Sequence, residues 1–301
     1  MNDSVKADGA PADATSRVAI VTDSTASLPT AIAAAHNISV VPVCVIVGDT
    51  SLDEGPGITP DKVAAELAAG SKVTTSRPTP EAMGMAYRGA SSRGARRLVS
   101  VHISAELSAT HESAVLAAKH APVPCAVIDS RTTGMALGFA AIAGARLAAA
   151  GADAEDVASV VTEVAQRSVT VVYVESLEFL KRGGRISSRS AALGTALRVH
   201  PLLAMNSAGT LEVVDKVRTQ SRAIGALVDH IVSASEGFAE GVDAAVQHCA
   251  APDVAERVAD MLRMRLGERA RDISVVPLSA ALSVHVGPGS VAVSAAPAVR
   301  F

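Results

Sequence analysis

The organisation of this chain is decided by residues 177–218, which read LEFLKRGGRISSRSAALGTALRVHPLLAMNSAGTLEVVDKVR. They follow a mainly β-branched run, Val169–Val174, which is typical of a buried strand. The pair Gly183-Gly184 permits a positive φ and a close approach of the backbone to its neighbours. Three cationic side chains flank these glycines: Lys181, Arg182 and Arg185.

This basic turn has two interpretations. A guanidinium presents paired donors in one plane, a geometry that suits a carboxylate or a phosphate. Arg185 is followed by Ile186, so we expect the backbone to return to the core there while the guanidinium reaches an anion. In the alternative interpretation the turn lies on the surface and its charges are simply solvated. The spacing of the residues favours neither.

Composition narrows the function classes. The chain has 301 residues, enough for two packed domains, and 49% of them are hydrophobic while only 2% are aromatic. The core must therefore consist mainly of Ala, Val, Leu and Ile. Because stacking platforms for bases are scarce and the net charge is −3, we expect no nucleic-acid partner.

The three cysteines, Cys44, Cys125 and Cys249, are far apart and lie in apolar runs, so we expect buried reduced thiols. No metal-ligand spacing occurs, and the sequence predicts neither a metal site nor a cofactor. No apolar stretch of membrane length and no signal-peptide pattern is present, so we expect a cytoplasmic protein without stable membrane insertion.

Residues 1–16 are polar and lack periodicity, which predicts a disordered tail. From residue 17 to 165, short apolar strands alternate with helical segments, so an α/β domain of three layers with a parallel sheet is expected. The predicted strands are residues 18–22, 38–47, 97–103 and 125–128. Helices are predicted to begin near Thr59, Thr79, Ser108, Thr133 and Asp153, where Pro or capping residues stand.

The regular alternation of strands and helices ends in residues 166–301, which we interpret as a second α/β domain with a mixed sheet. Residues 199–205 and 211–217 flank the turn signal Asn206–Gly209, which predicts an antiparallel pair. Helices near Arg222 and Pro252, strands at 242–247, 273–276 and 291–294, and a Gly287-Pro288-Gly289 turn complete this half.

Hydroxyl-rich loops follow several of the predicted parallel strands, at residues 23–25, 73–79, 104–110 and 129–130. Each loop alone is ordinary capping chemistry, because Ser, Thr and Asp prefer helix N-caps. Together they indicate one polar cleft at the carboxyl ends of the strands. Convergence of His102, His285, Ser104 and Asp129 in a hydrolase site is an alternative, although no GxSxG turn is present.

Seven segments, in this order, carry a resemblance to one family: IVTDSTASLP (20–29), VTTSRPTP (73–80), VHISAELSATHESA (101–114), VIDSRTTGMALG (127–138), LEFLKRGGRISS (177–188), LRVHPLLAMNSAGTLEVVDKVRT (197–219) and VHVGPGSVAV (284–293). The chain resembles the DegV family, which includes the fatty-acid-binding subunits of bacterial fatty acid kinase. The resemblance implies two α/β domains with a long-chain fatty acid between hydrophobic layers.

By position, the resemblance implies that hydroxyls and cations hold the carboxylate: Thr75, Ser76, Ser108, Arg185 and His285. It also implies a non-enzymatic carrier, whose bound acid is phosphorylated by a separate ATP-dependent fatty acid kinase. A basic patch is expected to face that kinase, or to be solvated surface charge: Lys181, Arg182, Lys216 and Arg218.

The sequence departs from the family pattern at three places. Ala109 stands where Gly is common, Arg77 replaces the commoner Gln, and Ala64-Ala65 replaces an aromatic pair. These changes bear on the shape of the pocket rather than on the fold. An alternative function is a hydrolase or acyltransferase that acts on acyl esters through Ser108 and His285.

Overall fold

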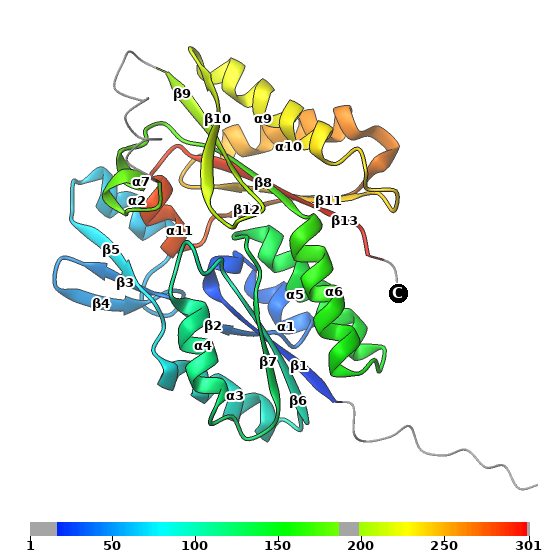
Figure 1. The fold of residues 1–301 in the computed structure, drawn as a ribbon. Helices are drawn as coiled ribbons and strands as arrows, with labels where there is room; N and C mark the ends of the chain where they lie inside the picture. Colours follow the sequence, from blue (N-terminus) through cyan, green and yellow to red (C-terminus); the bar gives the residue numbers. More distant parts are fainter. Residues whose placement is uncertain (1–16, 187–198, 300–301) are drawn as a thin grey trace, which may run out of the picture.

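A computed structural model describes residues 17–186 and 199–299 of the chain (Figure 1). The tail predicted for residues 1–16 lies outside the described residues. The described chain forms three sheets, of four, three and six strands, and the helices pack on their faces.

The first sheet has the strand order β2-β1-β6-β7, and every pair in it is parallel. Its strands are β1 (Val18–Asp23), β2 (Ser39–Val41), β6 (Arg97–His102) and β7 (Cys125–Asp129). Helices α3 (Pro80–Ser92) and α4 (Thr110–Ala118) cover one face, and α5 (Met135–Ala149) and α6 (Ala154–Arg167) cover the other. The predicted three-layer arrangement around a parallel sheet is therefore confirmed.

A small antiparallel sheet, β4-β3-β5, was not predicted. The single strand expected over residues 38–47 is wrong, because Pro42 lacks an N–H for the ladder and the chain leaves the first sheet there. Beyond the break run β3 (Cys44–Val47), β4 (Thr50–Asp53), α2 (Pro60–Ala68) and β5 (Val73–Ser76). Thr75 and Ser76 thus belong to a strand, rather than to the loop predicted for residues 73–79.

The second large sheet is mixed, with the order β10-β9-β8-β13-β11-β12, and only β11 and β12 run parallel. Its strands are β8 (Val169–Tyr173), β9 (His200–Met205), β10 (Leu211–Val217), β11 (Val242–His248), β12 (Ala270–Pro277) and β13 (Val291–Pro297). The predicted antiparallel pair is confirmed, since Met205 lies opposite Leu211. Helices α9 (Gln220–Ala234) and α10 (Pro252–Leu266) cover its outer face.

The inner face of this sheet packs against the first half of the chain. Ala245 and Ala296 join one hydrophobic cluster with residues of α5 and α6. All strands of the first sheet precede α6 and all strands of the mixed sheet follow it. The two-domain fold is therefore present, and the boundary near Ala165 stays a prediction.

Two short helices complete the part of the fold that bears on the site. Helix α7 (Glu178–Arg182) follows β8, and α11 (Ala280–Val286) precedes the Gly287-Pro288-Gly289 turn. No helix was expected at residues 280–286. Ser279 caps α11 by accepting a hydrogen bond from the Leu282 amide at 3.1 Å, and Gly287, with φ of 80°, ends it.

A fully buried hydrogen-bonded chain ties the loops after β1 and β6 together. The Asp23 carboxylate accepts from the amides of Thr25 and Ile103, at 3.0 and 3.1 Å, and from the Thr25 hydroxyl. Asp23 Oδ2, the oxygen that accepts from Ile103, also lies 2.9 Å from His102 Nδ1. His102 Nε2 in turn lies 2.7 Å from Ser100 Oγ. The order of groups is that of a hydrolytic triad, but Ser100 is 0% exposed and has no access to a substrate.

We predict that Asp23→Ala lowers the free energy of unfolding by about 3–5 kcal/mol, because four donors lose one buried acceptor. Urea unfolding measures this change. Asp49→Ala, at an exposed position, is the control and is expected to change stability by about 0.5 kcal/mol or less. A similar small loss in both variants would contradict a bracing role for Asp23.

Candidate functional site

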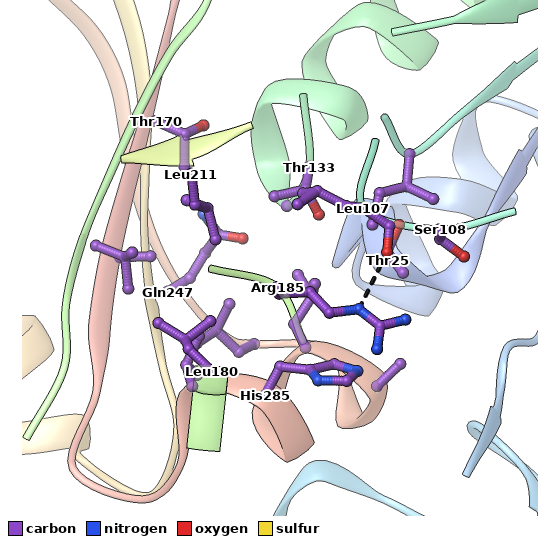
Figure 2. Close-up of a pocket in the computed structure, with 18 of the residues that line it drawn as sticks. Thr25, Leu107, Ser108, Thr133, Thr170, Leu180, Arg185, Leu211, Gln247 and His285 are labelled. Atoms are coloured by element: carbon purple, nitrogen blue, oxygen red, sulfur yellow. Dashed lines mark hydrogen bonds between the residues drawn. The ribbon is translucent and has the colours of Figure 1, made fainter. Parts of the chain in front are cut away.

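A cavity lies where the two domains and the small sheet meet, as Figure 2 shows. The space between its lining residues, including the open mouth, is about 750 Å³. Most of its wall is aliphatic and comes from segments far apart in sequence: Val43, Ile103, Leu107, Leu180, Leu211, Leu278 and Val286. Such a wall favours an apolar ligand.

Four of the five predicted head-group residues line this cavity: Thr75, Ser108, Arg185 and His285. They come from β5, the loop before α4, the turn after α7 and the last turn of α11. Ser76 is not among the lining residues. Successive side chains of a strand point to opposite faces, so Thr75 turns inward and Ser76 is exposed.

His285 holds Thr75 directly. Its Nε2 lies 2.8 Å from Thr75 Oγ1, while its Nδ1 is buried without a hydrogen-bond partner among the described residues. Burial, followed by the charge of Arg185, lowers the pKa of His285 to about 3. The imidazole is therefore neutral near pH 7, whereas the resemblance implied a cation.

The neutral ring has two tautomers. Buried N–H groups without an acceptor are rarer than buried acceptors without a donor, which favours the proton on Nε2. His285 then donates to Thr75, and the Thr75 hydroxyl keeps its own proton for a ligand. A carboxylate is the kind of ligand that such a hydroxyl would serve.

Arg185 is fixed by backbone carbonyl groups. Its Nε donates to the Leu107 carbonyl at 3.1 Å, and Nη1 donates to the Gly183 carbonyl. Burial lowers the pKa of Arg185, but a guanidinium remains charged at physiological pH. The cation thus sits at the wall of a mainly aliphatic cavity, where an anion would neutralise it.

Ser108 supplies a third polar group to the cavity wall. Its Oγ lies 2.8 Å from the Thr110 hydroxyl and also accepts from the Thr110 amide at 3.3 Å. Among the described residues Ser108 makes no hydrogen bond to His285, whose Nε2 is already engaged with Thr75. The pairing of nucleophile and base that the hydrolase alternative needs is therefore not formed among these residues.

Comparisons with known proteins fit this arrangement. A family model described as an uncharacterised protein of the DegV family matches residues 17–298. A DegV domain-containing protein of Streptomyces coelicolor is 44% identical over 272 residues, which cover 90% of this chain and 95% of the relative. The chain belongs to the DegV family.

Solved DegV structures share the whole fold. The fatty-acid-binding DegV protein from Thermus thermophilus matches with a TM-score of 0.87 and 29% identity, over 94% of this chain and all of that one. The DegV protein from Corynebacterium glutamicum matches with a TM-score of 0.80 and 30% identity, over 95% of this chain and all of that one. Solved members of the family thus include proteins that bind fatty acids.

In this DegV protein, two glycines let α7 and α11 interlock. A Cβ at Gly183 would lie 2.3 Å from His285 Nδ1, and a Cβ at Gly287 would lie 2.3 Å from the Phe179 ring. The close backbone approach predicted for the glycine pair is confirmed at Gly183. The ring of His285 is therefore positioned by the backbone of α7's last turn.

Glu54 secures the other end of α11 and was missed from the sequence. Its carboxylate accepts from the Ser24 hydroxyl at 2.6 Å, from the Ala281 amide at 3.4 Å and from the Ala280 amide. Burial raises the pKa of Glu54 to about 7, against these hydrogen bonds, which favour the ionised form. A single acidic residue in a polar stretch gives no local sign of such a role.

Further cavity residues were missed for a similar reason. Gln247 lies in an apolar strand and Thr170 carries no motif of its own, whereas Thr133 lies in one of the seven family segments but was not singled out as a site residue. Thr25 belongs to one of the hydroxyl-rich loops singled out above, and it also lines the cavity. Only the register of the mixed sheet brings Thr170 and Gln247 to the same wall.

The predicted partner-facing residues lie on two neighbouring segments of the chain. Lys181 and Arg182 form the last turn of α7, where the Arg182 guanidinium lies 5.1 Å from the centre of the Phe179 ring. Lys216 lies in β10 and Arg218 directly after it. Gln220, two residues further on, donates to Glu175 at 2.9 Å, which brings the end of β10 to the segment before α7.

We predict that Gly183→Ala weakens carboxylate-ligand binding by about tenfold, because the added methyl group must push the His285 ring away from Thr75. Such a loss corresponds to one ordinary hydrogen bond. Gly225→Ala is the control, since a Cβ there meets nothing within 4 Å. Equal affinities in both variants and wild type, measured by calorimetry, would contradict the positioning of His285 by α7.

Proposed function

We propose that this DegV-family protein is a non-enzymatic carrier that binds a long-chain fatty acid in the cavity between its domains. In this proposal Thr75, Ser108 and Arg185 hold the carboxylate, and His285 orients Thr75. The observation that carries it is an aliphatic cavity whose polar lining includes one guanidinium and convergent hydroxyls. Fatty-acid binding by the Thermus thermophilus relative supports it.

The energetics assign different tasks to the two ends of the ligand. Burial of an acyl chain of about sixteen carbons is worth on the order of 10 kcal/mol, at about 0.8 kcal/mol per methylene, before the costs of association. The tail therefore supplies most of the affinity. Charge-assisted hydrogen bonds at Arg185 fix the orientation of the carboxylate and discriminate against uncharged lipids.

We further propose that a separate ATP-dependent kinase phosphorylates the bound carboxylate and that this takes place in the cytoplasm. The basic patch on α7 and at the end of β10 is the docking surface in this proposal: Lys181, Arg182, Lys216 and Arg218. Among the described residues no helix is long and apolar enough to cross a membrane, and no group of three potential ligands could hold a metal ion.

The competing proposal, acyl-ester hydrolysis through Ser108 and His285, has weaker support. Ser108 is bonded to Thr110, and His285 has a pKa of about 3, far below the pH at which a general base works best. Turnover of a labelled acyl ester by the protein alone would favour hydrolysis. Absence of turnover together with ligand binding would favour the carrier.

We predict that mass spectrometry of the small molecules released on denaturation finds a near-stoichiometric fatty acid.

We also predict that Arg185→Gln weakens fatty-acid binding by about tenfold to a hundredfold, because a charge-assisted hydrogen bond is worth about 1.5–3 kcal/mol. Ser76→Ala is the matched control at an exposed position. An empty protein that takes up no added fatty acid would overturn the proposal.

For the partner surface, we predict that Lys181→Glu combined with Arg218→Glu lowers the rate of acyl-phosphate formation with the kinase at least tenfold. Reversed charge slows electrostatically steered association, whereas the affinity for the fatty acid itself stays unchanged. The control is Arg88→Glu combined with Lys119→Glu, two exposed cations of α3 and the end of α4. If both double variants behave alike, this face does not dock the kinase.

A further inference from the structure

The cavity has a second polar group, apart from the proposed head-group site. Thr170 and Gln247 line it on the side of the mixed sheet. Figure 2 places these two on one side of the view and Ser108 on the other, with Arg185 between them. In this view Thr170 and Gln247 thus lie on the other side of Arg185 from Ser108.

Strand register explains how the wall changes from apolar to polar. Val172 of β8, Ala292 of β13 and Gln247 of β11 lie directly opposite one another. Two residues along β8 and β13, Thr170 lies opposite Ser294, and their hydroxyl oxygens are 3.0 Å apart. Opposed residues of antiparallel strands point to the same face of the sheet. The row with Val172 and Ala292 is therefore aliphatic on these two strands, whereas the next row on the same face, with Thr170 and Ser294, carries hydroxyls.

Gln247 is held firmly in this part of the cavity wall. Its side chain is 0% exposed and both halves of its amide are paired. Oε1 accepts from the Met135 amide in the first turn of α5 at 2.9 Å, and Nε2 donates to Ser294 Oγ at 2.9 Å. Gly134, which also lines the cavity, packs closely against it, since a Cβ there would lie 2.6 Å from Gln247 Oε1.

A wall of this kind resists a growing alkyl chain. A methyl group that displaces the Gln247 amide leaves the buried Met135 N–H without its acceptor and takes from the Ser294 hydroxyl one of its two partners, so that only Thr170 remains, which is costly. The amide also links the mixed sheet to α5 of the first domain. A longer tail would have to separate the two domains or stay partly outside the cavity.

We propose that Gln247, held by Met135 and Ser294 and continued by Thr170, is the end wall of the acyl-chain cavity and sets the longest fatty acid that this protein accommodates. This inference rests on the proposed carrier function. Each methylene buried before the wall is reached strengthens binding by up to about fourfold. Beyond the wall the gain per added carbon disappears.

The test measures dissociation constants for saturated fatty acids of about 12 to 20 carbons. In the wild type the affinity is expected to rise with chain length up to a break. Gln247→Ala removes the wall and is expected to move the break to longer acids. Ala292→Val adds bulk beside Gln247, in the same cross-strand row of the cavity wall, and is expected to move it to shorter acids.

Gln166→Ala, the same change at an exposed position of α6, serves as control and is expected to keep the wild-type break. Thermal unfolding establishes which variants are folded. If Gln247→Ala fails to fold, Ala292→Val alone decides. A break that stays at the wild-type length in every folded cavity variant overturns the end wall while the carrier function stands, whereas no binding by the wild type overturns both.

Discussion

The site depends on the close packing of α7 against α11. Gly183 has no side chain, so the His285 ring lies against its backbone, and the ring in turn reaches Thr75 on a separate sheet. Two residues after Gly183, Arg185 is anchored by the carbonyls of Gly183 and Leu107. One short turn of chain thereby sets the positions of the cation and the hydroxyl that face the cavity.

The cavity itself results from how the two sheets meet. One part of the inner face of the mixed sheet packs against helices of the first domain, and another part lines the cavity. Because the lining is aliphatic, a ligand must bring a long apolar part to gain affinity. Because Arg185 carries the only guanidinium among the lining residues that the structure describes, that ligand also gains from a single anionic end.

Two buried polar clusters of the described chain hold segments of the fold together and do not face the cavity as reactive groups. Asp23, His102 and Ser100 have the order of a catalytic triad, yet their full burial makes them a brace between two loops. Glu54 similarly caps the helix that carries His285. A hydrogen-bonded pattern of side chains therefore identifies a reaction centre only where a cavity reaches it.

The sequence by itself determined the parallel and mixed sheets, the antiparallel pair at residues 200–217 and the helix starts at Thr59, Thr79 and Asp153, since these depend on local periodicity and capping. Family motifs further indicated Thr75, Ser108, Arg185 and His285. The break at Pro42, helix α11, the outward turn of Ser76 and the wall at Gln247 were decided only by tertiary structure. Each of these depends on which distant segment packs against the residue, and local residue preferences do not contain that information.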